Sequence, residues 1–230
     1  MTAENLFEIP KENQFTLDTS FLDRYRTKEP IWGAIGRVIY LRTYSRTLDD
    51  GTQEEFWQTC QRVVEGAYSV LKNQIKKAHS RWDENEAQVK AQDMYERMFA
   101  FKFLPPGRGL WAMGTKIISK IGGAAVNNCG FVSTKDIDQH FSQPFCDLAD
   151  FLMVGVGMGF DVRGAGKRKI LRPETPEGTF VVEDSREGWI ALLRITLDAY
   201  VHAGRLPAVV DYTRVRPEGT PLKTFGGVAS

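Results

Sequence analysis

Hydrophobic residues in the first hundred positions recur three or four residues apart, which is the spacing of one face of a helix. Those that would share the face of one long amphipathic helix are Phe56, Cys60, Val63, Val64, Ala67 and Leu71. Thr52 followed by Glu55 has the spacing of a capping box and predicts that this helix begins there. Asp83 and Glu86 repeat the pattern, and the apolar positions behind them predict a second helix to about Phe101.

Two shorter segments precede these helices. The stretch from Leu17 to Arg26 predicts a short helix, whereas Val38 to Tyr44 is rich in β-branched and aromatic residues and predicts an extended segment. The pattern changes at Leu104, where two prolines lack amide donors and two glycines favour turns. We therefore expect a mainly helical domain over residues 1–103 and a second domain over 104–230, opening with a loop-rich segment to Asn128.

Strands and helices alternate beyond that segment. A strand is predicted over Cys129–Ser133, a helix over Pro144–Val154 and a strand over Phe160–Val162. Asp184 is the expected cap of another helix, and Ala208–Thr213 is the next predicted strand. This order predicts an α/β fold, in which a helical N-terminal domain is attached to the opening of an α/β sheet or barrel.

Composition narrows the class of function. The 230 residues are 42% hydrophobic and 26% charged, with 30 Lys plus Arg against 29 Asp plus Glu, a net charge of +1. This balance gives no electrostatic reason to bind a nucleic-acid backbone or an anionic membrane. No run of about 18 apolar residues and no signal peptide occurs, so we expect a cytoplasmic protein. The last residues, 223–230, look like an interior loop, which predicts that the chain is a fragment, the product of a split gene or a chain ended artificially, three readings that the sequence leaves open.

Three cysteines without a CxxC pair argue against a disulfide framework and a zinc site, and the scattered histidines predict no metal. Cys60 lies on a helical apolar face and is expected to be buried, as is Cys146. Cys129 instead begins a short strand after two asparagines, where a ligand can reach the thiol. Redox chemistry needs such accessible thiols, usually two. The alternative, that Cys129 is a buried structural residue, stays open at this point.

Glycines from Gly155 to Gly159 would allow close approach of the backbone to a phosphate or sugar. They follow a helix and precede a strand, which is the reverse of the dinucleotide-binding fingerprint, so spacing alone favours a tight structural turn for this segment.

Five motifs occur in order. They are Leu104–Thr115 (LPPGRGLWAMGT), Asn127–Val132 (NNCGFV), Gly155–Phe160 (GVGMGF), Asp184–Trp189 (DSREGW) and Phe225–Ser230 (FGGVAS). This series resembles the N-terminal portion of adenosylcobalamin-dependent (class II) ribonucleotide reductases, from about residue 18 onward. The resemblance implies a helical N-terminal domain followed by the first part of a ten-stranded α/β barrel. It also implies that cobalamin generates a thiyl radical and that two other cysteines reduce the 2′ carbon of a ribonucleotide.

The resemblance assigns roles to five residues of this sequence. Cys129 matches the first cysteine of the reducing pair, which is regenerated through thioredoxin. Asn128 and Gly157 match positions that contact substrate phosphate or ribose. Pro106 stands where relatives often carry Ser or Thr, so a contact there comes from the backbone or is lost. Asp136 resembles an acidic position that binds a dNTP or ATP effector, although a plain loop carboxylate is an equal reading.

The same resemblance implies that much of the machinery lies beyond this chain: the radical cysteine, the second reducing cysteine and most of the adenosylcobalamin site. Without that remaining C-terminal part of the reductase, the chain alone is expected to be inactive. The loop from Arg163 to Glu183 looks short, which favours effector binding at the interface of a homodimer. Two alternatives remain, a fragment of a class I reductase large subunit and a non-catalytic nucleotide-binding regulatory module.

Overall fold

The computed structural model describes residues 8–48, 50–202, 204–220 and 229, and it divides into two compact units, Met1–Val126 and Asn127–Ser230. The division lies C-terminal to the change of pattern at Leu104, because short helices after that position belong to the first unit. The assignment of residues 104–230 to one catalytic domain stays a prediction. Within the described residues, no helix is long and apolar enough to cross a membrane.

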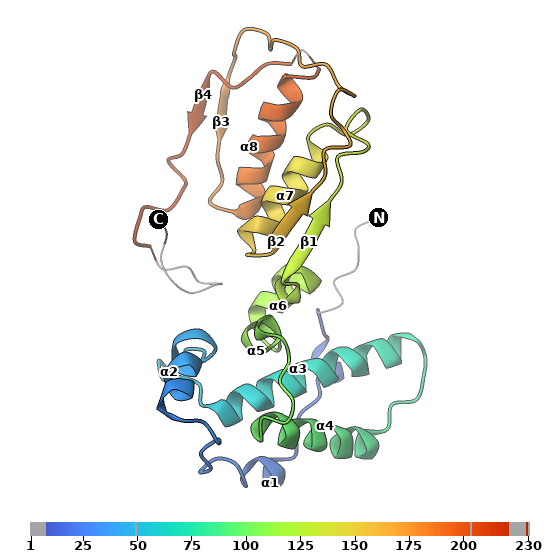
Figure 1. Cartoon of the computed structure of the whole chain (residues 1–230), viewed down its shortest axis with the longest axis vertical. Helices are drawn as coiled ribbons and strands as arrows, with labels where there is room; N and C mark the ends of the chain where they lie inside the picture. The colour runs from blue at the N-terminus through green and yellow to red at the C-terminus, as the bar shows by residue number, and fades with distance from the viewer. Residues whose placement is uncertain (1–7, 49, 203, 221–228, 230) are drawn as a thin grey trace. The chain divides into compact units, whose positions relative to one another are not determined.

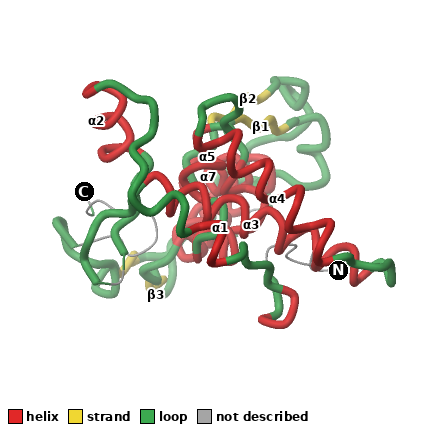
Figure 2. Tube along the Cα trace, turned by 90° about the horizontal axis from the view of Figure 1, so that it is seen from below, coloured by secondary structure: helices red, strands yellow, loops and turns green. Residues whose placement is uncertain are grey.

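The first unit is built on two packed helices, α3 (Phe56–Lys77) and α4 (Glu84–Phe99) (Figure 1). Its other elements are η1 (Lys11–Asn13), α1 (Thr19–Leu22), α2 (Ala34–Thr43), α5 (Gly107–Ala112), α6 (Lys116–Ile121) and η2 (Gly122–Val126). Figure 2 shows that helices and loops make up almost all of this unit. The expectation of a mainly helical front half is confirmed for the described residues.

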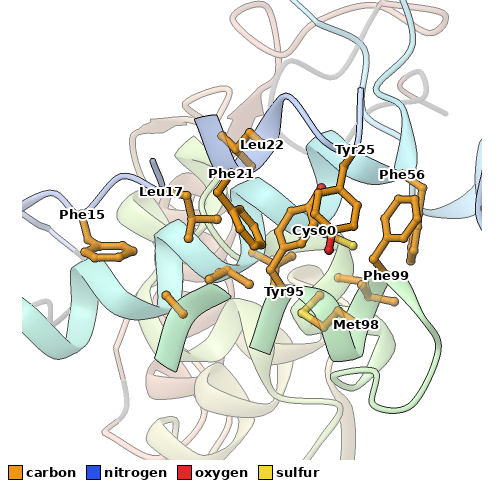
Figure 3. Packing of buried hydrophobic residues seen from close by; sticks show 14 of the residues in the cluster. Phe15, Leu17, Phe21, Leu22, Tyr25, Phe56, Cys60, Tyr95, Met98 and Phe99 are labelled. Carbon is orange, nitrogen blue, oxygen red and sulfur yellow. The ribbon is translucent and has the colours of Figure 1, made fainter. Parts of the chain in front are cut away.

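The core of the first unit is aromatic. Tyr95 and Met98 of α4 are fully buried, and the Tyr95 ring lies 4.8 Å from the ring of Tyr25 and 5.2 Å from that of Phe21 (Figure 3). Cys60 is also fully buried in this cluster, as its position on the apolar face of α3 predicts. Burying a side chain of this size stabilises the fold by about 1.5–3 kcal/mol, so the cluster fixes how α1, α3 and α4 pack.

Two predictions for the first unit are wrong. Residues 38–44 were expected to be extended, but α2 runs from Ala34 to Thr43, because Tyr40 is buried against Trp32 and Phe56 and this packing overrides a weak strand propensity. The segment to Asn128 was expected to be loop-rich, but it contains α5, α6 and η2. Thr115 begins α6 by accepting a hydrogen bond from the Ile117 amide.

The two predicted helix caps have different outcomes. Asp83 accepts a hydrogen bond from the Glu86 amide at 3.1 Å, as expected, and α4 then runs to Phe99. The capping box of α3 is displaced by three residues from the predicted one, because Glu55 is the cap and its amide donates to the Gln58 side chain at 2.8 Å. Thr52 instead donates to Asp50 in the preceding turn.

The second unit consists of two strand–helix–strand repeats. They are β1 (Cys129–Val132), α7 (Gln143–Met153) and β2 (Gly157–Phe160), then β3 (Thr179–Val181), α8 (Arg186–Ala199) and β4 (Val209–Asp211). β1 pairs with β2 and β3 with β4, both in parallel, and α7 packs against α8. Parallel neighbours need such crossovers, so the predicted alternation and the α/β class are confirmed.

Four details of the second unit differ from the predictions or fall outside them. β2 runs over Gly157–Phe160, whereas the strand was predicted over Phe160–Val162 with Gly157 in the turn before it. The cap of α8 is Ser185, whose hydroxyl accepts from the Gly188 amide, whereas Asp184 pairs with Arg216. β3 was not predicted from the sequence. The expected interior loop at residues 223–230 lies outside the described residues except for Ala229.

Candidate functional site

The register of β1 and β2 brings three of the predicted residues together. Cys129 is the direct partner of Gly157, and the Gly157 amide donates a hydrogen bond to the Asn128 carbonyl at 2.9 Å. Two features of the sequence produce this pairing. Gly155 adopts a φ of +77°, which reverses the chain after α7, and Val156 is buried and anchors the start of β2.

Cys129 is exposed and carries a free thiol at the first position of its strand. In a parallel sheet the side chains of paired residues stand on the same face, so the position beside the thiol belongs to Gly157 and holds no side chain. A Cβ at Gly157 would meet only the Asn128 carbonyl oxygen, at 3.5 Å, so packing alone does not demand glycine there. The bare backbone beside the thiol leaves space for a ligand to approach Sγ closely.

A carboxylate that the sequence analysis did not single out joins the far ends of the same strands. Asp161 accepts hydrogen bonds from the Ser133 hydroxyl at 2.7 Å, from the Thr134 amide at 2.9 Å and from the Arg163 amide at 3.2 Å. The bond from the Ser133 hydroxyl, followed by those from the backbone, holds the pKa of Asp161 well below its usual value. The Thr134 hydroxyl in turn accepts from the Gly164 amide at 2.9 Å. These bonds fix the turn that follows β2 against the turn that follows β1.

This cluster could have been predicted from the sequence, because the carboxyl ends of neighbouring parallel strands meet at one edge of a sheet and polar residues follow both strands. Ser133 and Asp161 each follow directly on a strand, and Thr134 is the residue after Ser133. The network uses both carboxylate oxygens of Asp161 for local hydrogen bonds, so it supports the geometry of β1 and β2.

Asp136 lies in the turn after β1 and is exposed. Its carboxylate is 3.8 Å from the Lys135 ammonium, and its carbonyl accepts from the amides of Gln139 and His140. The side chain is therefore open to a ligand, but the structure does not bring it into the pairing of Cys129 with Gly157.

Pro106 belongs to the first unit, where it is the cap residue of α5. Its carbonyl accepts hydrogen bonds from the amides of Gly109, at 2.7 Å, and Leu110, at 3.2 Å, and proline has no amide proton to donate. The polar groups of Pro106 are thus committed to α5. A substrate contact at this position would be a van der Waals contact.

The other two thiols are inaccessible. Cys60 is fully buried and Cys146 is 1% exposed, and burial is the main cause that raises the pKa of each thiol. Both predictions of a packing role are supported by this burial, because the thiolate is the reactive form and a raised pKa suppresses it. Among the described cysteines, Cys129 alone is exposed.

Cavities elsewhere in the described residues do not suit a large cofactor. Cavities of about 400 Å³ beside Trp82, about 440 Å³ beside Arg205 and about 200 Å³ beside Trp32 are present, and none is lined by Cys129 or Gly157. Pockets for drug-sized ligands span roughly 300–1,000 Å³, and adenosylcobalamin is much larger than such ligands. None of these three cavities is therefore large enough to hold adenosylcobalamin. The described residues also contain no group of three or more His, Cys, Asp and Glu side chains that could hold a metal ion.

Comparisons with known proteins show which proteins this chain is similar to. Residues 17–115 match the family model of the ribonucleotide reductase alpha domain. The chain is 44% identical to an adenosylcobalamin-dependent ribonucleoside-triphosphate reductase of Euglena gracilis, over 97% of this chain and 31% of that protein. It is 27% identical to the reductase of the same description from Lactobacillus leichmannii, over 94% of this chain and 36% of that protein.

A solved structure gives the same picture of the fold. The crystal structure of a B12-dependent (class II) ribonucleotide reductase superimposes with a TM-score of 0.77 at 24% identity, covering 94% of this chain and 38% of that one. The chain thus spans about a third of the length of the relatives it matches. By its five ordered motifs and these sequence matches, the chain is similar to the N-terminal part of the adenosylcobalamin-dependent (class II) ribonucleotide reductases, and the solved structure agrees with it in fold.

Proposed function

We propose that the chain is the N-terminal part of an adenosylcobalamin-dependent reductase that converts ribonucleotides to deoxyribonucleotides by thiyl-radical chemistry. Cys129 is one cysteine of the pair that reduces the 2′ carbon. The observation that carries this proposal is the exposed thiol of Cys129 at the start of β1, directly beside the bare backbone of Gly157. A thiol held on a strand, beside a position without a side chain, has the fixed direction and the free space that reaction with a bound ribose requires.

The electron balance assigns a clear task to Cys129. Two cysteine thiols become one disulfide and thereby supply two electrons and two protons. The 2′ C–O bond breaks, the hydroxyl leaves as water with one proton, and the 2′ carbon gains hydrogen in its place. A dithiol protein of the thioredoxin type then reduces the disulfide by exchange, which an exposed Cys129 permits.

Substrate binding falls to the residues around the thiol. Asn128 is exposed immediately before Cys129, and its carbonyl is held by the Gly157 amide, so its side chain is presented from a fixed backbone. We assign Asn128 and Gly157 to contacts with the ribose or phosphate of the substrate, and Pro106 to an apolar contact. Adenosylcobalamin supplies the radical and is held mainly by residues other than those described.

Regulation and partners complete the proposal. Asp136, exposed in the turn after β1, is assigned to a dNTP or ATP effector, bound at the interface of a homodimer. The remaining C-terminal part of the reductase supplies the radical cysteine and the second reducing cysteine. The expected cytoplasmic location stays a prediction.

The test joins this chain to the remaining part of the enzyme and measures deoxyribonucleotide formation with and without adenosylcobalamin, under reduction by thioredoxin or dithiothreitol. We expect cobalamin-dependent turnover that falls by about a thousandfold or more in Cys129→Ser, as for removal of a residue that takes part in the chemistry. Cys146→Ala is the matched control, because its thiol is buried and carries no proposed role.

Other outcomes identify the alternatives. Turnover that needs no cobalamin would indicate the class I large subunit. Nucleotide binding by this chain alone, with turnover that Cys129→Ser leaves intact, would indicate the regulatory module and leave Cys129 a packing role.

A further inference from the structure

A largely buried ion pair in the first unit holds the segment from Pro106 to Thr115 against α3. The Arg62 guanidinium donates to both carboxylate oxygens of Glu54, at 2.8 and 2.9 Å, and the two side chains are 15% and 3% exposed. The same guanidinium donates to the Leu110 carbonyl at 2.9 Å and to the Met113 carbonyl. One side chain of α3 therefore binds two backbone carbonyls of that segment, one within α5 and one just after it.

The carboxylate of Glu54 is itself fixed. The Thr59 hydroxyl donates to it at 2.6 Å, and the Tyr40 hydroxyl lies 2.7 Å from that of Thr59. The Glu54 amide donates to the Arg46 carbonyl at 2.7 Å. A carboxylate restrained in this way allows Arg62 a single orientation, because the planar guanidinium presents its donors in a rigid fork.

Backbones meet directly at the same place. A Cβ on Gly66 of α3 would lie 2.7 Å from the Gly114 amide nitrogen, and a Cβ on Gly114 would lie 2.4 Å from the Arg62 carbonyl oxygen. The Arg46 guanidinium stacks over the Trp111 ring, with 4.9 Å from the carbon to the ring centroid. The segment is thus held at several points by contacts that α5, a helix of 6 residues, does not provide for itself.

We propose that Arg62 and Glu54 are a positioning pair for substrate binding, which holds residues 106–115 in the conformation that presents Pro106 and its neighbours to the ribonucleotide. This inference rests on the proposed function, since it takes the segment to contact substrate. A largely buried ion pair is a costly way to gain stability, because desolvation offsets most of its attraction. We take the role of the pair to be the fixing of one backbone conformation. That conformation is the one in which the carbonyls of Leu110 and Met113 both accept hydrogen bonds from Arg62.

Two variants and one control test the pair. Arg62→Lys keeps a cation opposite Glu54 but lacks the fork that reaches both carbonyls. Glu54→Gln keeps the shape of the side chain but removes the counter-charge. Arg97→Lys is the control, because Arg97 forms an exposed ion pair with Asp93 on α4. Hydrogen exchange of this chain measures local opening, and kcat and KM for the ribonucleotide are measured in the joined reductase.

We expect amide exchange over 107–115 to rise at least about tenfold in both variants while exchange over 84–99 changes little, since local opening requires only the loss of local contacts. In the reductase, KM for the ribonucleotide rises about fivefold or more with kcat within about twofold, as loss of substrate binding alone predicts. The control changes neither quantity.

Each contrary result has a distinct meaning. Equal increases of exchange in 107–115 and 84–99 would make the pair a general stabilising contact and overturn the proposal. Local loosening without a change in KM would show that the segment is held but does not serve substrate binding, and would overturn it too. If the joined native protein lacks reductase turnover, the proposed function fails, and the proposal for substrate binding fails with it. Hydrogen exchange still reports separately whether Arg62 and Glu54 hold residues 107–115 in place.

Discussion

Replacing Gly114 by alanine puts a Cβ where the structure has no room for one. Gly114 has a φ of +74°, and its Cβ would lie 2.4 Å from the Arg62 carbonyl oxygen. Carbon and oxygen normally approach to about 3.3 Å, so the overlap is close to 1 Å, and the atom it meets is helix backbone that no rotamer change can move. The left-handed conformation costs about 1–2 kcal/mol and overpacking about 1–3 kcal/mol, for a total of about 2–5 kcal/mol.

A matched variant separates these two costs. Gly51 has a φ of +83°, but a Cβ there meets no atom within 4 Å, so Gly51→Ala carries the conformational cost alone. Thermal and urea unfolding of both variants and the native chain give the comparison. With about 2–4 °C per kcal/mol for a chain of this size, we expect Gly114→Ala to lower the melting temperature by on the order of 10 °C and Gly51→Ala by about half of that or less.

The difference between the two variants is the steric contribution of the contact between Gly114 and α3. Equal destabilisation by Gly114→Ala and Gly51→Ala would refute the reasoning, because it would mean that the two backbones are not in the close contact described. The segment from Pro106 to Thr115 would then be held against α3 by one contact fewer.

Two further predictions follow from the thiols and from Asp161. A thiol reagent such as DTNB should label one cysteine rapidly in the folded chain, because Cys129 is exposed whereas Cys60 and Cys146 are buried. Cys129→Ser should abolish this fast phase of labelling. Fast labelling that persists in the variant would contradict the burial of Cys60 and Cys146. The pKa of Asp161 is lower in the folded chain than the ordinary carboxyl pKa of about 3.9. Its hydrogen bonds, including that from Thr134, therefore stabilise the fold at pH values above about 3.9, and this stabilisation is lost as the pH falls below about 3.9. The stability difference between the native chain and Asp161→Asn in urea unfolding should therefore shrink from about pH 6 to about pH 3, and a difference independent of pH would contradict the assignment.

Periodicity predicted the elements that bury a continuous face. The structure confirms α3, the helix after Asp83 and the order of β1, α7 and β2, all of which follow from local patterns. The predicted apolar face of α3 is buried at Phe56, Cys60, Val63 and Val64, whereas Leu71 is 47% exposed. The start of α3 was predicted less well. Thr52 and Glu55 were expected to form the capping box, but Thr52 donates to Asp50 and the box is formed by Glu55 and Gln58. α2 was missed because the aromatic contacts of Tyr40 outweigh the β-branched composition of its helix.

The candidate site was predictable as a set of residues but not as an arrangement. Asn128, Cys129 and Gly157 each lie at a position that the sequence marks, by a motif or by a loop-to-strand junction. That Cys129 pairs with Gly157 depends on the register of two strands joined by a helix, and a shift of one residue would have placed Met158 beside the thiol. At the next pair of this register, the Met158 side chain lies over Gly130, where a Cβ would be 2.5 Å from the Met158 sulfur.

Arg62 shows why the remaining part of the arrangement was beyond the sequence. Along the chain it is one polar residue of an amphipathic helix, and nothing in its neighbourhood distinguishes it from the exposed Arg97 of α4. Its function as a contact arises only because the chain returns after about 50 residues and places two carbonyls within reach of its guanidinium. The acceptors in such long-range contacts are backbone carbonyls, which every residue carries, so no pattern of side chains along the sequence predicts them. The conformation of the LPPGRGLWAMGT segment is therefore determined in good part by α3, and we expect substitutions on α3 to alter it more than most substitutions within it.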